Sequence, residues 1–217
     1  MSDPLIEPRR GRPGYDRQGV LEVAVRAFNE YGYDATSMGT LATRLGLSKS
    51  AIYHHFPSKE QLLDAALDEA LGGLEGVLTE AGATTGRAAD RLIYVLDRAV
   101  HVLVERLPNV TLLLRLRGNT PVERAALERR REFDRAITGL VTAARDAGEL
   151  RDDIDPRIAE RLLFGMINSI VEWYRPEGPE DAERLARDVV SVATDGLLIE
   201  RAAAPHPTRD DGSPPHG

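Results

Sequence analysis

Apolar residues recur every three to four positions along almost the whole chain, and this helical periodicity constrains the fold more than any other feature. In the first periodic segment the apolar side chains are those of Val20, Ala24, Ala27, Phe28 and Tyr31. The strict alternation that is typical of a half-buried β-strand is scarce. We therefore predict an all-α protein of about nine helices.

Residues that begin or end helices divide this pattern into elements. Asp, Ser and Thr side chains accept hydrogen bonds from the free N–H groups of a first turn, and glycine favours the conformation that ends a helix. The predicted helices cover about 16–31, 37–45 (begun by Thr36 or Ser37), 48–55, 58–71, 87–106, 110–117, 120–147, 156–174 and 180–200. Segment 110–117 fits a strand or a helix and is assigned to a short buried helix, because helices flank it. The Gly-, Ala- and Thr-rich segment 72–86 predicts a fraying helix end and a loop.

Composition divides the chain into a head and a body. The net charge is −7, but residues 1–60 carry 8 Lys and Arg against 7 Asp and Glu, so the acidity lies C-terminal to them. We predict a flexible basic arm at 1–14, a DNA-binding domain at 15–60, a ligand-binding and dimerisation domain at 61–201, and a disordered tail at 202–217.

Several classes of function are disfavoured by what the sequence contains. There is no cysteine and no apolar run of bilayer length, so we expect no thiolate chemistry, no Cys-ligated metal and no membrane span. Sequence motifs of hydrolases, zinc proteases and P-loop enzymes are missing. The sequence predicts a cytoplasmic protein that is not an enzyme and that uses neither a cofactor nor a metal.

Residues 37–56 read as two short helices joined at Gly46, with the small residue Ala42 where the helices approach each other. This is the layout of a helix-turn-helix, whose second helix reads base edges in the major groove. An ordinary helical hairpin with a polar surface would have the same spacing. The side chains suited to DNA contacts on or near the second helix are Ser48, Lys49, Ser50, Tyr53, His54 and Lys59.

The run from Leu41 to Leu63, LATRLGLSKSAIYHHFPSKEQLL, resembles the signature of the TetR family of transcriptional regulators. The resemblance covers about residues 15–65 and implies an all-α fold with an N-terminal three-helix head and a C-terminal domain for ligand binding and dimerisation. It implies that Thr36, Ser48, Tyr53 and Lys59 contact the DNA backbone, whereas Lys49, Ser50 and His54 lie at or near bases. Ser50 departs from the family pattern, because glycine is frequent at this position. The resemblance therefore leaves the operator sequence open.

The N-terminal arm contains Arg10-Gly11-Arg12-Pro13, the core of an AT-hook. Glycine lets the backbone lie deep in a narrow A·T-rich minor groove, where the negative potential attracts Arg10 and Arg12. A disordered basic tail that attracts phosphate without choosing sequence is the alternative. Because the arm precedes a helix-turn-helix, we favour insertion into the groove.

The family resemblance also implies a homodimer formed through the last two helices. Residues 158–174 support this independently, because a helix that is apolar almost all round must be buried on more than one face. A central core helix of a monomer is the alternative.

Apolar and polar residues of the body are candidates for an inducer site, although core packing is the alternative for each apolar one. The candidates are Leu114, Arg115, Phe133, Ile137, Met166, Asn168 and Trp173. Residues 172–179, EWYRPEGP, are similar to a motif of TetR regulators that respond to acyl-CoA thioesters. Segment 111–133 is similar to actinobacterial regulators of phenylacetate catabolism of the PaaR type, which implies phenylacetyl-CoA as inducer.

The sequence analysis thus predicts a repressor that binds a pseudo-palindromic double-stranded DNA operator as a homodimer. A small hydrophobic or acyl-CoA-type inducer would release it by favouring a dimer with the wrong spacing of heads. The alternatives are a drug-responsive repressor of the efflux type and a DNA-binding adaptor without an inducer.

Overall fold

The computed structural model describes residues 16–198, and within that range it is built of α-helices without a β-strand. The all-α prediction is confirmed, with ten helices in place of about nine. They are α1 (Arg17–Tyr31), α2 (Met38–Leu45), α3 (Lys49–His55), α4 (Lys59–Thr79), α5 (Ala81–Thr84), α6 (Ala88–Glu105), α7 (Leu107–Leu114), α8 (Pro121–Asp146), α9 (Pro156–Trp173) and α10 (Ala182–Leu197). The predicted flexible arm at 1–14 and disordered tail at 202–217 lie outside the described residues.

Local capping fixes most helix starts where the sequence predicts them. The Asp16 carboxylate accepts from the Gly19 N–H at 2.8 Å at the start of α1. The second helix begins at Ser37 and not at Thr36, because the Ser37 hydroxyl accepts from the Thr40 N–H at 3.0 Å. At the start of α8, Thr120 accepts from the Glu123 N–H, and the Glu123 carboxylate accepts in return from the Asn119 N–H at 2.7 Å.

Helix α4 is longer than predicted, and the loop expected over 72–86 is wrong. The helix continues through three glycines to Thr79, and the short helix α5 follows. A Cβ on Gly73 would lie 2.8 Å from a methyl carbon of Val102 in α6. Glycine at this position therefore serves the close packing of α4 against α6, a tertiary requirement that local composition does not reveal.

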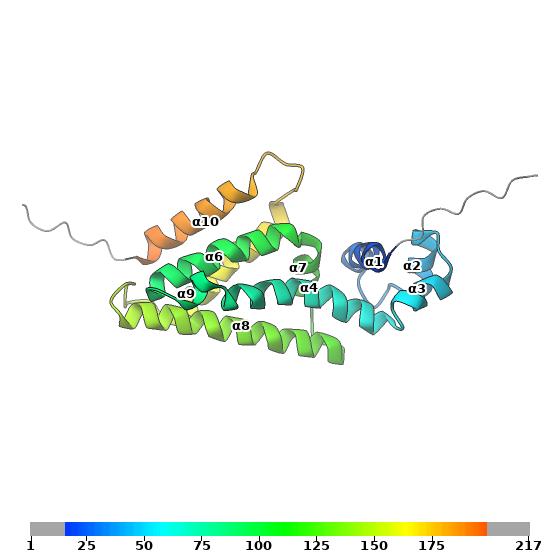
Figure 1. Cartoon of the computed structure of the whole chain (residues 1–217), viewed down its shortest axis with the longest axis horizontal. Coiled ribbons are helices and arrows are strands. Elements are labelled where there is room, and N and C mark those ends of the chain that lie inside the picture. The colour runs from blue at the N-terminus through cyan, green and yellow to red at the C-terminus, as the bar shows by residue number, and fades with distance from the viewer. Residues whose placement is uncertain (1–15, 199–217) are drawn as a thin grey trace, which may run out of the picture.

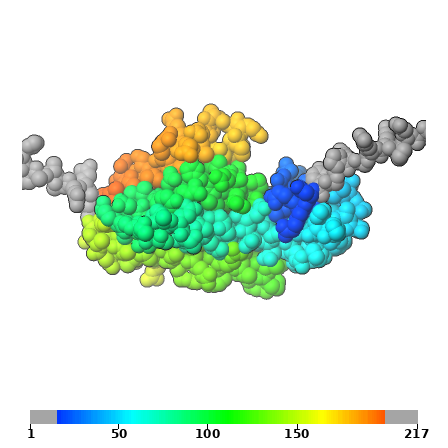
Figure 2. Space-filling model, viewed as in Figure 1, coloured from blue at the N-terminus to red at the C-terminus, as the bar shows by residue number. Residues whose placement is uncertain are grey.

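The molecule is elongated, with helices α1–α3 at one end and the other helices forming the body (Figure 1). Helix α4 begins in the head and runs into the body, where it packs against α6, α7 and α8. Helix α10 packs mainly along α6, on the outside of the body. The space-filling view shows head and body in continuous contact (Figure 2).

Segment 110–117 forms a helix, as assigned, but α7 begins earlier, at Leu107, and ends at Leu114. Pro108 stands in its first turn, where the missing N–H costs no hydrogen bond. This helix packs against α1 and α4, so it connects the head with the body.

Apolar packing and one charged clamp hold the body together. Phe133 of α8 and Phe164 of α9 are both buried and pack edge to face, with ring centroids 5.3 Å apart. Arg129 of α8 donates two hydrogen bonds to the carboxylate of Glu75 in α4, at 2.8 and 2.7 Å. A bidentate pair of this kind fixes the orientation of both side chains and so aligns α8 with α4.

Candidate nucleic-acid interface and ligand site

Helices α2 and α3 meet at a tight turn that glycine makes possible. Gly46 has φ 65°, in the left-handed region that favours glycine, and the Leu47 N–H donates to the Ala42 carbonyl at 3.0 Å. Ser48 then caps α3 by accepting from the Ala51 N–H at 3.1 Å. Ala42 is 5% exposed, as its predicted place between the two helices requires.

Helix α3 presents one polar face to solvent and buries the other. Ile52 is fully buried, whereas Lys49, Ser50, Tyr53 and His54 are exposed, with Tyr53 at 47%. These four residues stand at positions i, i+1, i+4 and i+5, so they share one side of the helix. Four of the predicted DNA contacts therefore lie together on an accessible surface, and exposed Ser48 lies at its edge.

Two other predicted contacts are engaged within the head. The Thr36 side chain is 1% exposed, and its hydroxyl donates to the Gly32 carbonyl at 2.8 Å. The Lys59 ammonium group donates to the Tyr33 carbonyl at 3.0 Å and lies 4.1 Å from the centre of the Tyr33 ring. The structure thus places Thr36 in the packing of the α1–α2 turn. Arg10 and Arg12 lie outside the described residues.

Hydrogen bonds connect the head to the body around α1 and α7. The Asn29 side-chain amide donates to the Pro108 carbonyl at 2.8 Å, and Arg115 donates to the Asn29 carbonyl at 3.1 Å. Buried Asn109 donates at 3.0 Å to Glu69 of α4, whose carboxylate also accepts from Gln18 at 3.1 Å. The position of the head is thus coupled to α4 and α7.

Two clefts flank this junction. The larger, of about 670 Å³, lies between the end of α1, the turn that follows it, the end of α7 and the chain leading to α8. The smaller, of about 490 Å³, lies beside α1, α4 and the start of α7. Both volumes fall in the range of small-molecule sites.

The predicted ligand residues do not share one cavity. Leu114 and Arg115 line the larger junction cleft. Phe133 and Ile137 are 4% and 0% exposed and pack in the core. Met166 lines an apolar groove between α9 and α10, and Asn168 is half-buried on α9. Trp173 is 48% exposed at the end of α9.

An apolar face runs along α9 and α10 on the outside of the single chain. Large apolar side chains are exposed there: Ile158 at 46%, Leu162 at 65%, Trp173 at 48% and Val192 at 62%. Helix α9 therefore buries one side in the body and leaves an apolar stripe on the other. The central helix of a monomeric core would have no such stripe.

Two carboxyl groups of α8 and α9 lie in a poorly hydrated environment. Burial raises the pKa of Asp134 and the pKa of Glu160, and the charge of Asp134 adds to the rise at Glu160. Arg130 and Arg161 oppose both shifts. Glu160 is 7% exposed, so its ionisation near neutral pH opposes folding.

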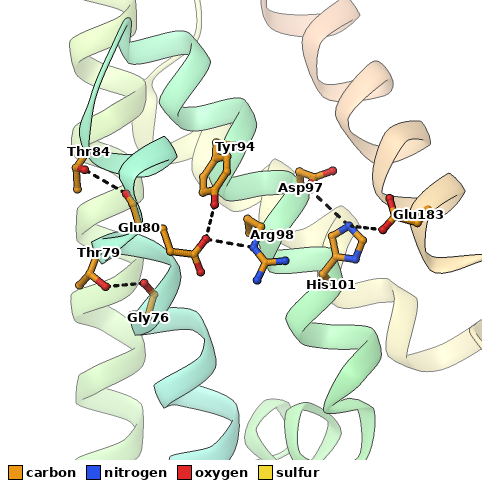
Figure 3. Close-up of polar contacts among 9 residues, drawn as sticks. All are labelled: Gly76, Thr79, Glu80, Thr84, Tyr94, Asp97, Arg98, His101 and Glu183. Carbon is orange, nitrogen blue, oxygen red and sulfur yellow. Dashed lines mark hydrogen bonds and ion pairs between the residues drawn. The ribbon is translucent and has the colours of Figure 1, made fainter.

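Polar side chains also connect α10 with α6 (Figure 3). The His101 ring is 3.7 Å from the Asp97 carboxylate on its own helix and 3.9 Å from the Glu183 carboxylate on α10. Tyr94 and Arg98 lie on α6 with His101, and both contact Glu80, which precedes α5. Tyr94 donates a hydrogen bond to Glu80, and Arg98 Nε lies 3.3 Å from the same carboxylate oxygen. This hydrogen bond is the main reason for the lowered pKa of Glu80.

Asn29 and Tyr33 are residues of the junction that sequence reasoning missed. The Asn29 Oδ1 and the Tyr33 hydroxyl oxygen are buried and have no hydrogen-bond partner. Burial, together with the charges of Glu60, Glu123 and Asp34, raises the pKa of Tyr33 to about 12, so the phenol stays protonated at neutral pH. No local sequence signal identifies them, because their role depends on how α1 meets α7.

The sequence matches two family profiles that together cover most of the body and the head. Residues 20–66 match "Bacterial regulatory proteins, tetR family", and residues 85–197 match "Tetracyclin repressor-like, C-terminal domain". A helix that could cross a membrane is not found among the described residues.

Related proteins agree with these matches along nearly the whole chain. The HTH-type transcriptional repressor KstR2 of Rhodococcus jostii is 29% identical and covers 95% of this chain and 100% of its own. A TetR-family regulator of Streptomyces coelicolor A3 is 51% identical, with a TM-score of 0.78 over 83% of this chain and 91% of its own. AibR, in a structure with isovaleryl coenzyme A and operator DNA, is 24% identical and shares the fold, with a TM-score of 0.68 over 81% of this chain and 96% of its own.

Proposed function

Since the chain belongs to the TetR family of transcriptional regulators and is a ligand-responsive repressor of that type, not an enzyme, we propose that it acts in the cytoplasm as a homodimer on a pseudo-palindromic operator and is released by an acyl-CoA-type inducer. Two heads would sit about one DNA turn apart, roughly 34–36 Å.

The polar face of α3 carries the DNA-binding part of this proposal. Lys49, Ser50, Tyr53 and His54 are exposed together on a helix whose opposite face is anchored by buried Ile52. We assign Tyr53 and Ser48 to phosphates and Lys49, Ser50 and His54 to base edges. Lys59 is assigned to phosphate, because its ammonium group has further N–H donors beside the one that it gives to the Tyr33 carbonyl, and Arg10 and Arg12 are assigned to the minor groove.

The apolar stripe of α9 and α10 supports the homodimer. Exposed Leu162 and Val192 would be buried against the same surface of a second copy, as a two-fold interface requires. A dimer fixes the distance between two heads, which an inducer can then change.

The acyl-CoA assignment rests on the EWYRPEGP motif and on the relatives. AibR is a neighbour in fold whose structure contains isovaleryl coenzyme A. A phenylacetyl or other acyl group suits an apolar pocket, and the phosphates of coenzyme A suit arginine. A drug-type inducer or an inducer-free adaptor remains the alternative, and the buried state of Phe133 and Ile137 is the observation that favours the adaptor.

The DNA-binding assignment is tested by two substitutions on the same helix face. Tyr53→Phe should weaken binding to all duplexes by a similar factor, about fivefold, because it removes one phosphate hydrogen bond. His54→Ala should reduce discrimination between operator and mutated half-sites, because it removes a base contact. Gel-shift titrations on both duplexes measure the two effects. If neither variant changes affinity or discrimination, α3 is not the reading helix.

The inducer assignment is tested by release of a labelled operator fragment. Phenylacetyl-CoA and isovaleryl-CoA should dissociate the complex, whereas free phenylacetate, isovalerate and coenzyme A should not. Release by a free acid alone would move the assignment to a drug-type or acid inducer. If no member of the panel releases the DNA, the inducer-free adaptor is the assignment that the result supports.

A further inference from the structure

The larger junction cleft contains polar and charged residues to which the proposed function assigns no role. It holds about 670 Å³ and is lined by residues of the head, such as Asn29 and Tyr33, and of the body, such as Arg115 and Arg117. A molecule bound here would contact both domains at once, where α1 meets α7 (Figure 1).

Two residues that line this cleft, Asn29 and Tyr33, each have a buried polar atom without a hydrogen-bond partner. Asn29 uses its amide N–H on the Pro108 carbonyl, which leaves Oδ1 as an acceptor without a donor. The Tyr33 hydroxyl is buried without a partner while its ring packs on Phe28, with centroids 5.2 Å apart. Unsatisfied buried groups are costly, so a state that gives them partners is favoured.

The missing partners define complementary groups on a ligand. Asn29 Oδ1 needs an N–H or O–H donor, and the Tyr33 hydroxyl can donate to a carbonyl oxygen. A single amide group supplies both. Phe28, Leu112 and Leu116 give the same cleft an apolar wall.

The charges around the cleft favour an anionic end on the ligand. Arg115 and Arg117 lie on its body side, and neither forms an ion pair with the residues that the structure describes. The lining also holds two acidic residues: Glu123 is buried and accepts from the Asn119 N–H, and Asp34 is exposed on the head side. An anion would therefore bind beside the exposed arginines, away from both carboxylates.

We propose that the junction cleft binds an amide-bearing anion with an apolar group, and that its binding shifts the head relative to the body. The pantetheine arm of an acyl-CoA thioester and an N-acylated amino acid share this chemistry. The inference rests on the proposed function only in that the bound molecule acts as the inducer.

A ligand can reach the two unpartnered atoms only if the head moves, so ligand binding is coupled to the position of the head. Both atoms are shielded from solvent, so a ligand reaches them only if α1 and the turn after it move away from α7. Such movement disturbs the hydrogen bond from Arg115 to the Asn29 carbonyl. The ligand thus binds the displaced head more tightly than the present one, which is the condition for a population shift.

Calorimetric titration of the full chain with phenylacetyl-CoA and with phenylacetylglycine tests the site. Tyr33→Phe should weaken binding of both probes about fivefold, the effect of one neutral hydrogen bond. It should not lower the melting temperature of the ligand-free protein, because the hydroxyl that it removes has no partner. Arg117→Gln should weaken both probes three- to tenfold, with a larger loss at low salt.

Tyr94→Phe is the matched control, because it removes a hydroxyl in the body, distant from the cleft, and should change neither affinity by more than about twofold. Phenylacetate, which lacks an amide, should show the same affinity for Tyr33→Phe as for the wild-type protein. Affinities unchanged by Tyr33→Phe, or no binding of either amide-bearing probe, would overturn the junction site.

Operator release separates this inference from the proposed function. If thioesters release DNA equally from wild type and Tyr33→Phe, the acyl-CoA inducer stands and the junction site fails. If phenylacetylglycine binds in a Tyr33-dependent manner while no thioester releases DNA, the junction site stands and the acyl-CoA inducer fails.

Discussion

At the scale of single residues, burial decides which polar side chains are available for function. Tyr53 and His54 are exposed on α3, whereas the hydroxyl of Thr36 is enclosed by the backbone of the turn that it stabilises. Family resemblance alone treats these positions alike. The structure shows that Tyr53 and His54 are accessible whereas Thr36 is buried, and substitutions can test this difference.

Thr36→Val should lower stability without removing DNA binding. The variant leaves the Gly32 carbonyl without its donor at 2.8 Å, and we expect a loss of about 1 kcal/mol in the free energy of unfolding. Thermal unfolding and gel shifts on the folded protein measure the two effects. Thr142→Val, which removes a comparable hydroxyl-to-carbonyl bond at a half-buried position of α8, serves as control. A more than tenfold loss of operator affinity in folded Thr36→Val would return this residue to the phosphate contacts.

Glu160→Gln should stabilise the protein in a pH-dependent way. Burial raises the pKa of Glu160 above its ordinary value of 4.5, so the folded state binds more protons than the unfolded state between the two values. Wild-type stability therefore falls as pH rises through this window, and the glutamine variant lacks the fall. Denaturant titrations from pH 4 to pH 8 should show a gain that grows with pH. Glu172→Gln, on the exposed side of the same helix, should show no such trend.

At the scale of elements, helix boundaries follow from local chemistry except where a distant element intervenes. Ser48, Thr120 and Asp155 cap helices within their own first turns, so the sequence suffices to place these starts. Helix α4 continues through Gly72, Gly73 and Gly76 and packs against α6, which it approaches closely at Gly73, and no local pattern contains that information. The same holds for the junction, where Asn29 and Tyr33 gain their role only after α1 packs on α7.

The glycines of α4 should respond to alanine in opposite directions. Gly72→Ala should raise the free energy of unfolding by about 0.5–1 kcal/mol, because nothing lies near the added Cβ and alanine is the better helix former. Gly73→Ala should lower it, because the added carbon would lie 2.8 Å from Val102. Chemical denaturation measures both. Equal stabilisation by the two changes would show that α4 and α6 do not need this close contact.

At the scale of the whole molecule, the exposed polar face of α3 and the exposed apolar stripe lie on different parts of the chain. The α3 face lies in the head, and the apolar stripe of α9 and α10 lies on the body, with α4 running between them. The net charge of −7 belongs to this arrangement, because the head is close to neutral and most of the acidity lies in the body. A weakly basic head should depend on two paired half-sites for affinity.

Leu162→Asp should separate the two copies and abolish operator binding while each chain stays folded. Leu162 is 65% exposed in the single chain, so a charge is harmless there unless a second copy covers it. Light scattering after size-exclusion chromatography gives the mass, and circular dichroism reports the fold. Ala136→Asp, at an exposed position of α8, should leave the mass unchanged. A Leu162→Asp variant with the wild-type mass would place the interface elsewhere.

The continuity of α4 has a mechanical consequence. At 1.5 Å per residue, its 21 residues form a lever of about 32 Å, nearly the distance between successive major-groove sites on one side of a duplex. A tilt of about 5° about the body end would move the head end by about 3 Å. Two such levers in a dimer, swinging in opposite directions, would change the distance between the reading helices by about 6 Å, nearly two base-pair steps. Sub-ångström repacking near the pivot is thus multiplied at the DNA, and no hinge within the helix is required.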